Sequence, residues 1–184
     1  MRLILPLLLL LVCGMRLSAQ SVQNVERSRE QTDFGAEGDF HKPIPISADA
    51  LQSLRMSKGA DDLLQECAEQ EGIPAAEIPA TWFVASEIRL NRVPSSGLVV
   101  RGEHACLGGA HISQFWVLAK STSGYRVVFR GRADALGVLP TRTNNYRDLQ
   151  LARVTQAGAY VDDVIFRYSR GEYHLSGHRT EHPN

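Results

Sequence analysis

The sequence predicts an α+β domain in which short N-terminal helices pack on an antiparallel meander sheet of six to eight strands. Three observations lead to this fold class. Helix-like apolar spacing is confined to residues 47–72, short alternating apolar segments follow Pro79, and turn signals separate those segments. The links are too short to hold crossover helices, so neighbouring strands should run antiparallel.

The first 19 of the 184 residues are typical of a secretory signal peptide. Arg2 precedes an apolar run that ends at Val12, and small residues lead up to Ala19. The run is too short to span a bilayer. A lipoprotein is the alternative, but Val12 stands where a small residue should precede the acceptor Cys13. We therefore expect removal of residues 1–19, no membrane span, and an exported protein that is periplasmic or extracellular.

The remaining chain divides by composition. Residues 20–46 are polar and show no apolar period until the stretch PIPI at 43–46, so we expect a flexible leader there. A single globular domain should follow over residues 47–178. Residues 179–184 should form a tail.

Two helices are expected at the start of the domain. Ser47 should cap a short helix that carries Leu51 on its buried face. A second helix, starting at residue 61 or 62, should place Cys67 on its buried side. Gly72 should end that helix, since glycine is the usual residue at a helix C-terminus.

Short strands account for the rest of the domain. The first alternates apolar residues between Trp82 and Leu90, and the last is followed only by the tail. Glycine- or asparagine-containing turns at 121–124, 143–145, 156–158 and 170–171 indicate hairpins between successive strands. The later strands are expected at 98–101, 115–120, 125–130, 136–139, 147–154, 160–168 and 172–175.

Removal of the signal peptide leaves two cysteines, Cys67 and Cys106. In an oxidising compartment, two cysteines predict one disulfide. The bridge would close a loop of about 40 residues, which the chain-entropy relation converts to roughly 4 kcal/mol of stabilisation. It would join the second helix to the segment around Cys106.

That segment, RGEHACLGGAHISQFW at 101–116, invites three interpretations. Cys106 with His104 and His111 would be a catalytic set, but no third orienting group is evident. The same three residues do not match a zinc-finger spacing. The favoured interpretation is structural, with Gly108 and Gly109 permitting a bend that the disulfide holds. We accordingly expect no metal and no cofactor.

Three stretches together resemble a group of small secreted bacterial proteins of unknown function. They are GLVVRGEHACLGGAHISQFWVLAKSTSGYRVVF, TRTNNYRDLQL and FRYSRGEYHLSG, and the resemblance covers roughly residues 87–177. It implies a strand-rich fold with an FG-GAP-like strand–loop–strand segment, which in such proteins can hold calcium. Here Asn91, Arg92 and Ser95 stand where acidic ligands would be expected, so the calcium site is not implied for this chain.

Charge is distributed unevenly along the chain. Residues 20–88 hold 13 acidic and 5 basic side chains, whereas residues 89–184 hold 7 acidic and 13 basic, with Lys120 the only lysine of the latter. Arginine suits planar recognition of carboxylates and phosphates. Two interpretations are open. Either the acidic and basic halves neutralise each other when they pack, or the basic half forms a face for an acidic partner.

The binding candidates follow from strand alternation. Arg126, Val128 and Arg130 should share one face of their strand. In the segment 147–154 the arginines and leucines have the same parity, so either the leucines are exposed or the arginines lie at the edge of the sheet. An exposed leucine pair rimmed by arginines would be a partner-binding patch. The candidate residues are Arg126, Arg130, Arg147, Leu149, Leu151 and Arg153.

These observations favour an exported, non-catalytic binding module over an enzyme. It would act on another protein, as an inhibitor, an immunity-type protein or an envelope assembly factor, or on an envelope polymer of acidic character. The alternatives are an envelope hydrolase that uses Glu103, His104 and His111, and a purely structural envelope protein. Few aromatic residues and a slightly negative charge after residue 19 argue against nucleic-acid binding.

Overall fold

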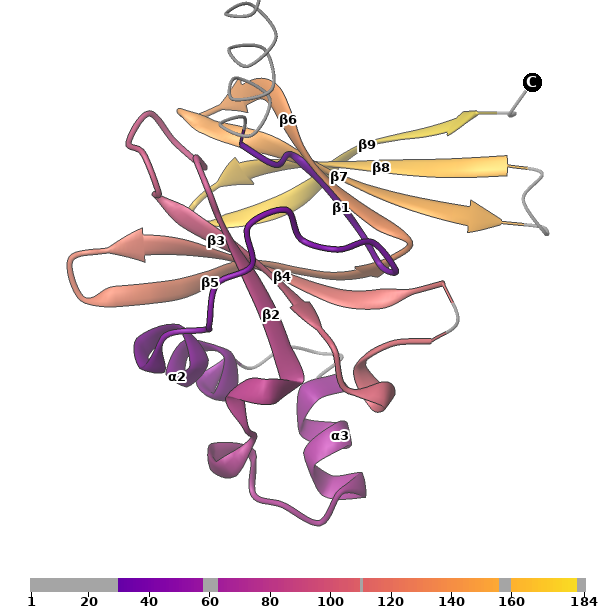
Figure 1. Cartoon of the computed structure of the whole chain (residues 1–184). Helices are drawn as coiled ribbons and strands as arrows, with labels where there is room; N and C mark the ends of the chain where they lie inside the picture. Colours follow the sequence, from indigo (N-terminus) through magenta and orange to yellow (C-terminus); the bar gives the residue numbers. More distant parts are fainter. Residues whose placement is uncertain (1–29, 58–62, 110, 156–159, 182–184) are drawn as a thin grey trace, which may run out of the picture. The chain divides into compact units, whose positions relative to one another are not determined.

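The computed structural model describes residues 30–57, 63–109, 111–155 and 160–181 (Figure 1). The predicted signal peptide, residues 20–29 of the predicted leader and the predicted turn at 156–158 lie outside this part of the chain. The described residues from Gln31 onward belong to one compact unit.

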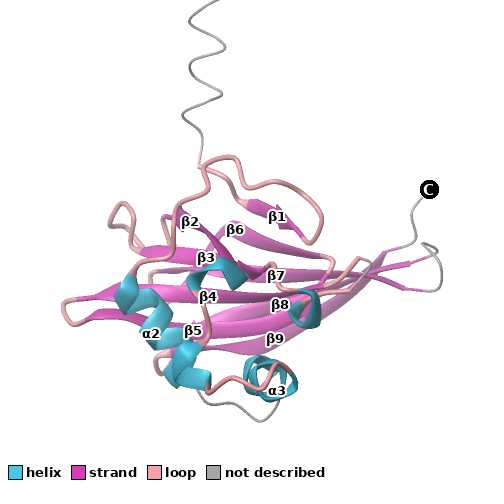
Figure 2. Cartoon of the chain, turned by 60° about the horizontal axis from the view of Figure 1, so that its bottom comes forward, coloured by secondary structure: helices cyan, strands magenta, loops and turns pink. Residues whose placement is uncertain are grey.

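The described residues form two α-helices and nine strands, and every strand pairing is antiparallel (Figure 2). Single turns of 3-10 helix occur at Ala75–Glu77, Ala80–Trp82 and Ala105–Leu107. The larger elements are α2 (Ala48–Met56), α3 (Leu63–Gln70), β1 (Asp33–Gly35), β2 (Phe83–Ile88), β3 (Gly97–Gly102), β4 (Ser113–Ser121), β5 (Gly124–Ala133), β6 (Ala135–Thr143), β7 (Tyr146–Thr155), β8 (Tyr160–Ser169) and β9 (Glu172–Glu181).

Short helices on an antiparallel sheet are thus confirmed, but the single sheet of six to eight strands is wrong. The strands form a four-stranded sheet, in the order β2-β3-β4-β5, and a five-stranded sheet, in the order β1-β6-β7-β8-β9. Only Asp134 separates β5 from β6, where the chain passes from one sheet to the other. The amide of Asp134 donates to the carbonyl of Ala152 at 3.0 Å. Backbone hydrogen bonding continues through the corner, so a single aspartate in the sequence is the only local sign of it.

The four-stranded sheet is the middle layer of the domain. Figure 1 shows the helices on one side of it and the five-stranded sheet on the other. All six residues of β3 are buried, so this strand shows no alternation of buried and exposed side chains. The domain has two hydrophobic cores, one on each face of this sheet. The core between the two sheets includes Phe34, Ile88, Leu90, Val99, Phe115, Val117, Phe129, Leu136, Val138, Leu149 and Leu151. The core under the helices includes Leu51, Leu54, Leu64, Ala68, Ile78, Phe83, Leu98, Val100, Trp116 and Leu118.

Both predicted helices are present, and the start predicted for the second at residue 61 or 62 lies outside the described residues. The Ser47 side chain caps α2 by accepting from the amide of Ala50. Gly72 follows α3 with a φ of 69°, and the amide of Ile73 donates to the carbonyl of Ala68 at 3.0 Å. This is the left-handed C-terminal cap in which glycine costs least.

The predicted flexible leader is corrected from residue 31 onward, because residues 31–46 belong to the domain. β1 pairs with β6, and Ile44 forms an isolated bridge with Ala85 of β2. Phe34 is fully buried and Phe40 is 5% exposed, with their rings in edge contact at 5.0 Å. Two isolated aromatic side chains with only small and acidic residues between them do not establish a helical or strand period, which is why the sequence pattern missed this segment.

The tight hairpins lie where they are predicted. Asn144 and Asn145 have φ values of 51° and 69°, and Arg170 and Gly171 have values of 51° and 97°. Two successive positive φ values match the twist of the flanking strands. β9 continues to Glu181, so the predicted tail is wrong for residues 179–181, and residues 182–184 are not described.

Candidate binding surface

The bend around Cys106 is held by a disulfide, as predicted. Cys67 of α3 and Cys106 are bonded, with Cα atoms 5.8 Å apart. The imidazole of His104 stacks on the indole of Trp82, with ring centroids 3.9 Å apart, and its Nδ1 lies 3.2 Å from Cys106 Sγ. The bridge joins α3 to the segment that follows β3, and the stack joins that same segment to the 3-10 turn before β2.

The three residues of the hydrolase alternative are engaged by different partners. Glu103 pairs with Arg101 at 2.6 Å, and the Nε2 atom of His104 lies 3.8 Å from Glu71. His111 pairs with Glu37 at 2.8 Å, well exposed to solvent. In the part of the chain that the structure describes, no hydrogen bond joins Glu103, His104 and His111, so their arrangement is not that of a nucleophile with its base.

A β-bulge separates the two arginines predicted on β5. The register between β4 and β5 shifts after Val117, which pairs with Phe129, while Leu118 pairs with Val127. Val128 is the extra residue, and a bulge of this kind reverses the alternation beyond it. Arg126 therefore lies on the side of the five-stranded sheet, whereas Arg130 lies on the side of the helices. The shared face predicted for Arg126 and Arg130 is wrong.

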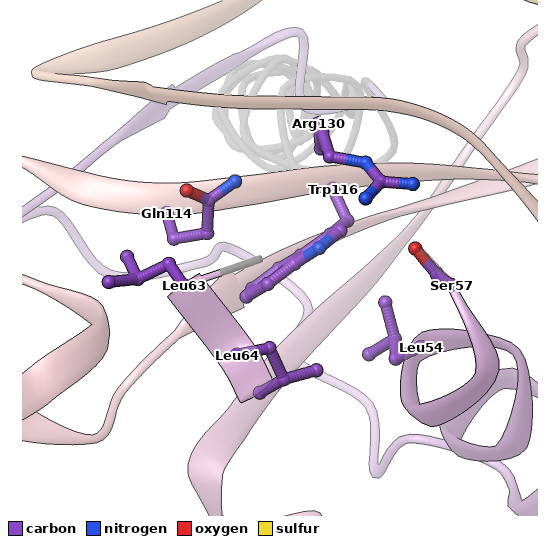
Figure 3. A pocket seen from close by; sticks show the side chains of 7 residues that line it. All are labelled: Leu54, Ser57, Leu63, Leu64, Gln114, Trp116 and Arg130. Atoms are coloured by element: carbon purple, nitrogen blue, oxygen red, sulfur yellow. The ribbon is translucent and has the colours of Figure 1, made fainter. Parts of the chain in front are cut away.

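Arg130 lies beside a small hollow between the helices and the four-stranded sheet. Figure 3 shows Arg130 and Gln114 at one side of this hollow, the indole of Trp116 across it, and Leu54 and Leu64 opposite. The hollow has a volume of about 10 Å³, which is space for about one water molecule. It is a packing gap and too small for a ligand.

The leucine patch predicted on β7 is corrected by burial. Leu149 is fully buried and Leu151 is 4% exposed, both between the sheets. The sequence left two possibilities, exposed leucines or arginines at the edge of the sheet. The leucines are buried, and the two arginines lie at either end of β7, beyond the leucines. Arg147 is buried and donates to the carbonyls of Leu139 and Val138. Arg153 is exposed and donates from Nε to the carbonyl of Arg132 at 2.9 Å.

A tyrosine cluster that the sequence analysis did not identify lies at the hairpin end of β6 to β9. Because these strands are antiparallel neighbours, the turns at 144–145 and 170–171 lie at the same end of the sheet. The rings of Tyr146 and Tyr168 stack with centroids 3.8 Å apart, and Tyr173 meets Tyr168 edge-on at 5.3 Å. The side chain of Asn144 donates to the carbonyl of Tyr168 at 2.8 Å and so ties the two hairpins together.

Arginines flank this stacked pair. Arg126 of β5 donates to the hydroxyl of Tyr168 at 3.3 Å, and Arg142 donates to the carbonyl of Asn145 at 3.1 Å. Both arginines are exposed and both stacked tyrosines are partly exposed. We name the four residues Arg126, Arg142, Tyr146 and Tyr168 the tyrosine–arginine surface. Of the six binding candidates from the sequence, Arg126 is the one that belongs to it.

Buried groups hold this surface from below. Tyr173 is 8% exposed, and its hydroxyl donates to the carbonyl of Arg147 at 2.6 Å. Burial raises the pKa of Tyr173 far above its usual value, and the nearby Asp148 raises it further. Burial also raises the pKa of Tyr168, with Tyr146 adding to this effect and Arg126 opposing it. Both hydroxyls stay protonated at neutral pH; that of Tyr173 donates to the Arg147 carbonyl, and that of Tyr168 accepts from Arg126.

The sequence offered a weak signal for this surface. Tyr146, Tyr168 and Tyr173 each stand within two residues of a predicted hairpin turn. Alternation alone could not show that they meet, because their contact depends on the order of β7, β8 and β9 in the sheet.

Comparison with known proteins does not assign the chain to a family. No protein-family model, no curated protein and no solved structure matches the chain. Among the described residues no helix is long and apolar enough to cross a membrane, and no group of three or more His, Cys, Asp or Glu side chains is placed to hold a metal ion.

Proposed function

We propose that the protein is an exported, non-catalytic binding module whose tyrosine–arginine surface recognises an acidic segment of a partner protein. The observation that carries this proposal is the stacked Tyr146–Tyr168 pair with Arg126 hydrogen-bonded to its rim. Tyrosine and arginine are enriched among the residues that dominate binding energy at protein interfaces.

Preorganisation supports binding at this surface. The Asn144 bond to the Tyr168 carbonyl and the positive-φ turns leave little freedom to the two hairpins. A partner would therefore meet aromatic rings that are already ordered. Ordering a flexible side chain on binding costs about 0.5–1.5 kcal/mol, and this cost is largely avoided here.

Charge favours an acidic partner. Arg126 and Arg142 belong to the surface, and Arg170, in the neighbouring turn, is also exposed. The guanidinium group pairs with carboxylates through two parallel hydrogen bonds, and it also stacks on aromatic rings. The protonated tyrosine hydroxyls add donors. An acidic segment in extended conformation would pair its carboxylates with the guanidinium groups and accept hydrogen bonds from the tyrosine hydroxyls.

Export is part of the proposal and has its own support. The N-terminal 19 residues are typical of a signal peptide, and a disulfide such as Cys67–Cys106 is stable in oxidising compartments.

The proposal is tested by charge reversal at matched positions. Arg126→Glu changes the surface, and Arg92→Glu makes the same change at an exposed loop position outside it. Each tagged variant is cross-linked in the cell envelope fraction, and captured proteins are quantified by mass spectrometry. We expect a protein with an acidic exposed segment that wild type and Arg92→Glu capture equally and that Arg126→Glu captures at least tenfold less, a loss of about 1.4 kcal/mol.

Unchanged capture by Arg126→Glu would contradict the proposal, provided that its circular dichroism spectrum and melting temperature match those of wild type. A captured partner that depends on His104 or His111 instead of Arg126 would favour the hydrolase alternative.

A further inference from the structure

A wide cavity opens where β5 passes into β6. Its volume is about 900 Å³, and its lining includes loop 35–38, Gly109, Ile112, Arg132, Asp134 and Val154. β7 begins at Tyr146, in the tyrosine–arginine surface, and reaches this cavity at Val154. At about 3.3 Å per residue, the two places lie roughly 25 Å apart along the strand. The cavity is therefore separate from the surface proposed above.

The walls of the cavity are tied to the two sheets. Arg101 holds loop 35–38 by donating to the carbonyls of Gly35 and Gly38. The amide of Ala36 donates to the carbonyl of Asp134 at 2.7 Å, so the loop is also fixed at the corner between the sheets. A cavity with fixed walls needs little rearrangement to accept a ligand.

Some charged side chains of the lining have ion-pair or hydrogen-bond partners within the described part of the protein, and one does not. Glu37 pairs with His111 at 2.8 Å, and one carboxylate oxygen of Asp134 accepts from the amide of Val154 at 3.0 Å. Arg132 is exposed, and none of the ion pairs between described residues involves it. Its backbone is fixed through the bond from Arg153 Nε to the Arg132 carbonyl. A positive group with free donors at a cavity wall suits a carboxylate.

The rest of the lining is largely apolar. Val154 is 51% exposed although it is a large apolar side chain, and Ile112 and Ala36 are partly buried beside it. Small-molecule sites have volumes of about 300–1,000 Å³ and combine an apolar lining with few polar groups that fix orientation. The cavity has this combination, with the Arg132 guanidinium as the orienting group.

We propose that this cavity binds a carboxylate that carries an apolar group, with the carboxylate on Arg132 and the apolar group against Val154 and Ile112. Two sources offer this chemistry, a free aliphatic acid and the C-terminus of an apolar peptide. Binding here is independent of the tyrosine–arginine surface, so either proposal can fail without the other.

The test uses hexanoate and the tripeptide acetyl-Ala-Val-Leu, each beside its neutral amide. Each is titrated into the 15N-labelled protein while the amide signals of Gly109, Ile112 and Val154 are followed by NMR. We expect saturable shifts of these signals with at least one carboxylate and at least tenfold weaker binding of the matching amide. Tighter binding of hexanoate identifies an aliphatic acid as the ligand class, and tighter binding of the tripeptide identifies a peptide C-terminus.

Two variants with one control assign the site. Arg132→Gln should weaken carboxylate binding at least tenfold, about 1.4 kcal/mol, and Arg92→Gln should leave it unchanged. Gly109→Leu should abolish binding, because a Cβ there would lie 3.7 Å from Arg132 Nη2 without backbone strain and the longer side chain would fill the cavity. The proposal is overturned if neither carboxylate gives saturable shifts at these amides, if amides bind as tightly, or if both variants bind like wild type.

Discussion

The guanidinium of Arg101 lies over the ring of Phe40, 5.1 Å from its centroid. The same guanidinium donates to the carbonyls of Gly35 and Gly38 and pairs with Glu103. Arg101 is only 7% exposed, although it stands in a strand that is otherwise apolar or glycine. One side chain of β3 thus attaches the N-terminal segment to the four-stranded sheet.

Arg101→Met should destabilise the protein by about 3 kcal/mol. Methionine keeps the apolar stem but leaves two carbonyls without their donor, and hydrogen bonds to a charged group contribute about 1.5–3 kcal/mol each. Urea unfolding measures the change. Arg92→Met is the matched control at an exposed position, where a substitution should change stability by less than about 0.5 kcal/mol. Equal midpoints for the two variants would remove Arg101 as the attachment of residues 31–40.

Leu149→Ser should unfold the protein or lower its stability by several kcal/mol. Leu149 is fully buried between the sheets, so serine leaves a cavity and a hydroxyl without a partner. Leu175→Ser is the matched control, because Leu175 is 66% exposed on β9. Thermal melting followed by circular dichroism compares the two. A Leu149→Ser protein that melts with wild type would place this residue outside the core and restore the patch that the sequence suggested.

The sequence predicts the individual elements well because each depends on local signals. Ser47 and Gly72 delimit the helices through their own backbone preferences, and paired positive-φ residues delimit the hairpins. The division into two sheets was not predictable in this way. The chain passes from β5 into β6 at Asp134, with no glycine or proline at that position. The corner is stabilised by a hydrogen bond to β7, which is distant in the sequence.

The binding candidates were chosen on the assumption that side chains alternate between the two faces of a strand. In β5 this alternation is interrupted at one residue. Val128 is an extra residue in β5 that any side chain can occupy, so nothing in the sequence distinguishes it from its neighbours. One such insertion moved Arg130 to the opposite face from Arg126. The tyrosine cluster was missed for a different reason, since its three members come from β7, β8 and β9 and meet only through sheet order.

Replacing both Cys67 and Cys106 by alanine should cost about 4 kcal/mol of stability. The bond closes a loop with a sequence separation of 39, and the chain-entropy relation gives this magnitude for such a loop. Urea unfolding of the oxidised protein and of the double variant measures the difference. A free-thiol assay on the denatured, unreduced protein lacking residues 1–19 is the accompanying control. It should find no thiol, and two titratable thiols would show that the bridge does not form.

Stability should fall in alkaline solution through Tyr173. The folded-state pKa of this hydroxyl is raised above its usual value of 10.0, first by burial and then by Asp148. Above pH 10 the unfolded chain releases this proton while the folded chain keeps it, so the unfolded state binds fewer protons and unfolding becomes more favourable as pH rises. Below pH 10 both states are protonated and the contribution is constant. One such group changes the free energy of unfolding by about 0.7 kcal/mol per pH unit at about pH 10, and the slope rises toward about 1.4 kcal/mol per pH unit at higher pH.

Tyr173→Phe separates this effect from the other alkaline titrations. The variant loses the bond to the Arg147 carbonyl, so it should start less stable by about 1 kcal/mol at neutral pH. Between pH 10 and pH 11, however, wild type should lose about 1 kcal/mol more than the variant does, because the unfolded tyrosine is already half ionised at pH 10. Urea unfolding at pH 8, 10 and 11 gives both curves. If the two proteins lose stability in parallel above pH 10, Tyr173 ionises in the folded state as it does in the unfolded chain, and its hydroxyl is not the buried donor that supports the tyrosine–arginine surface.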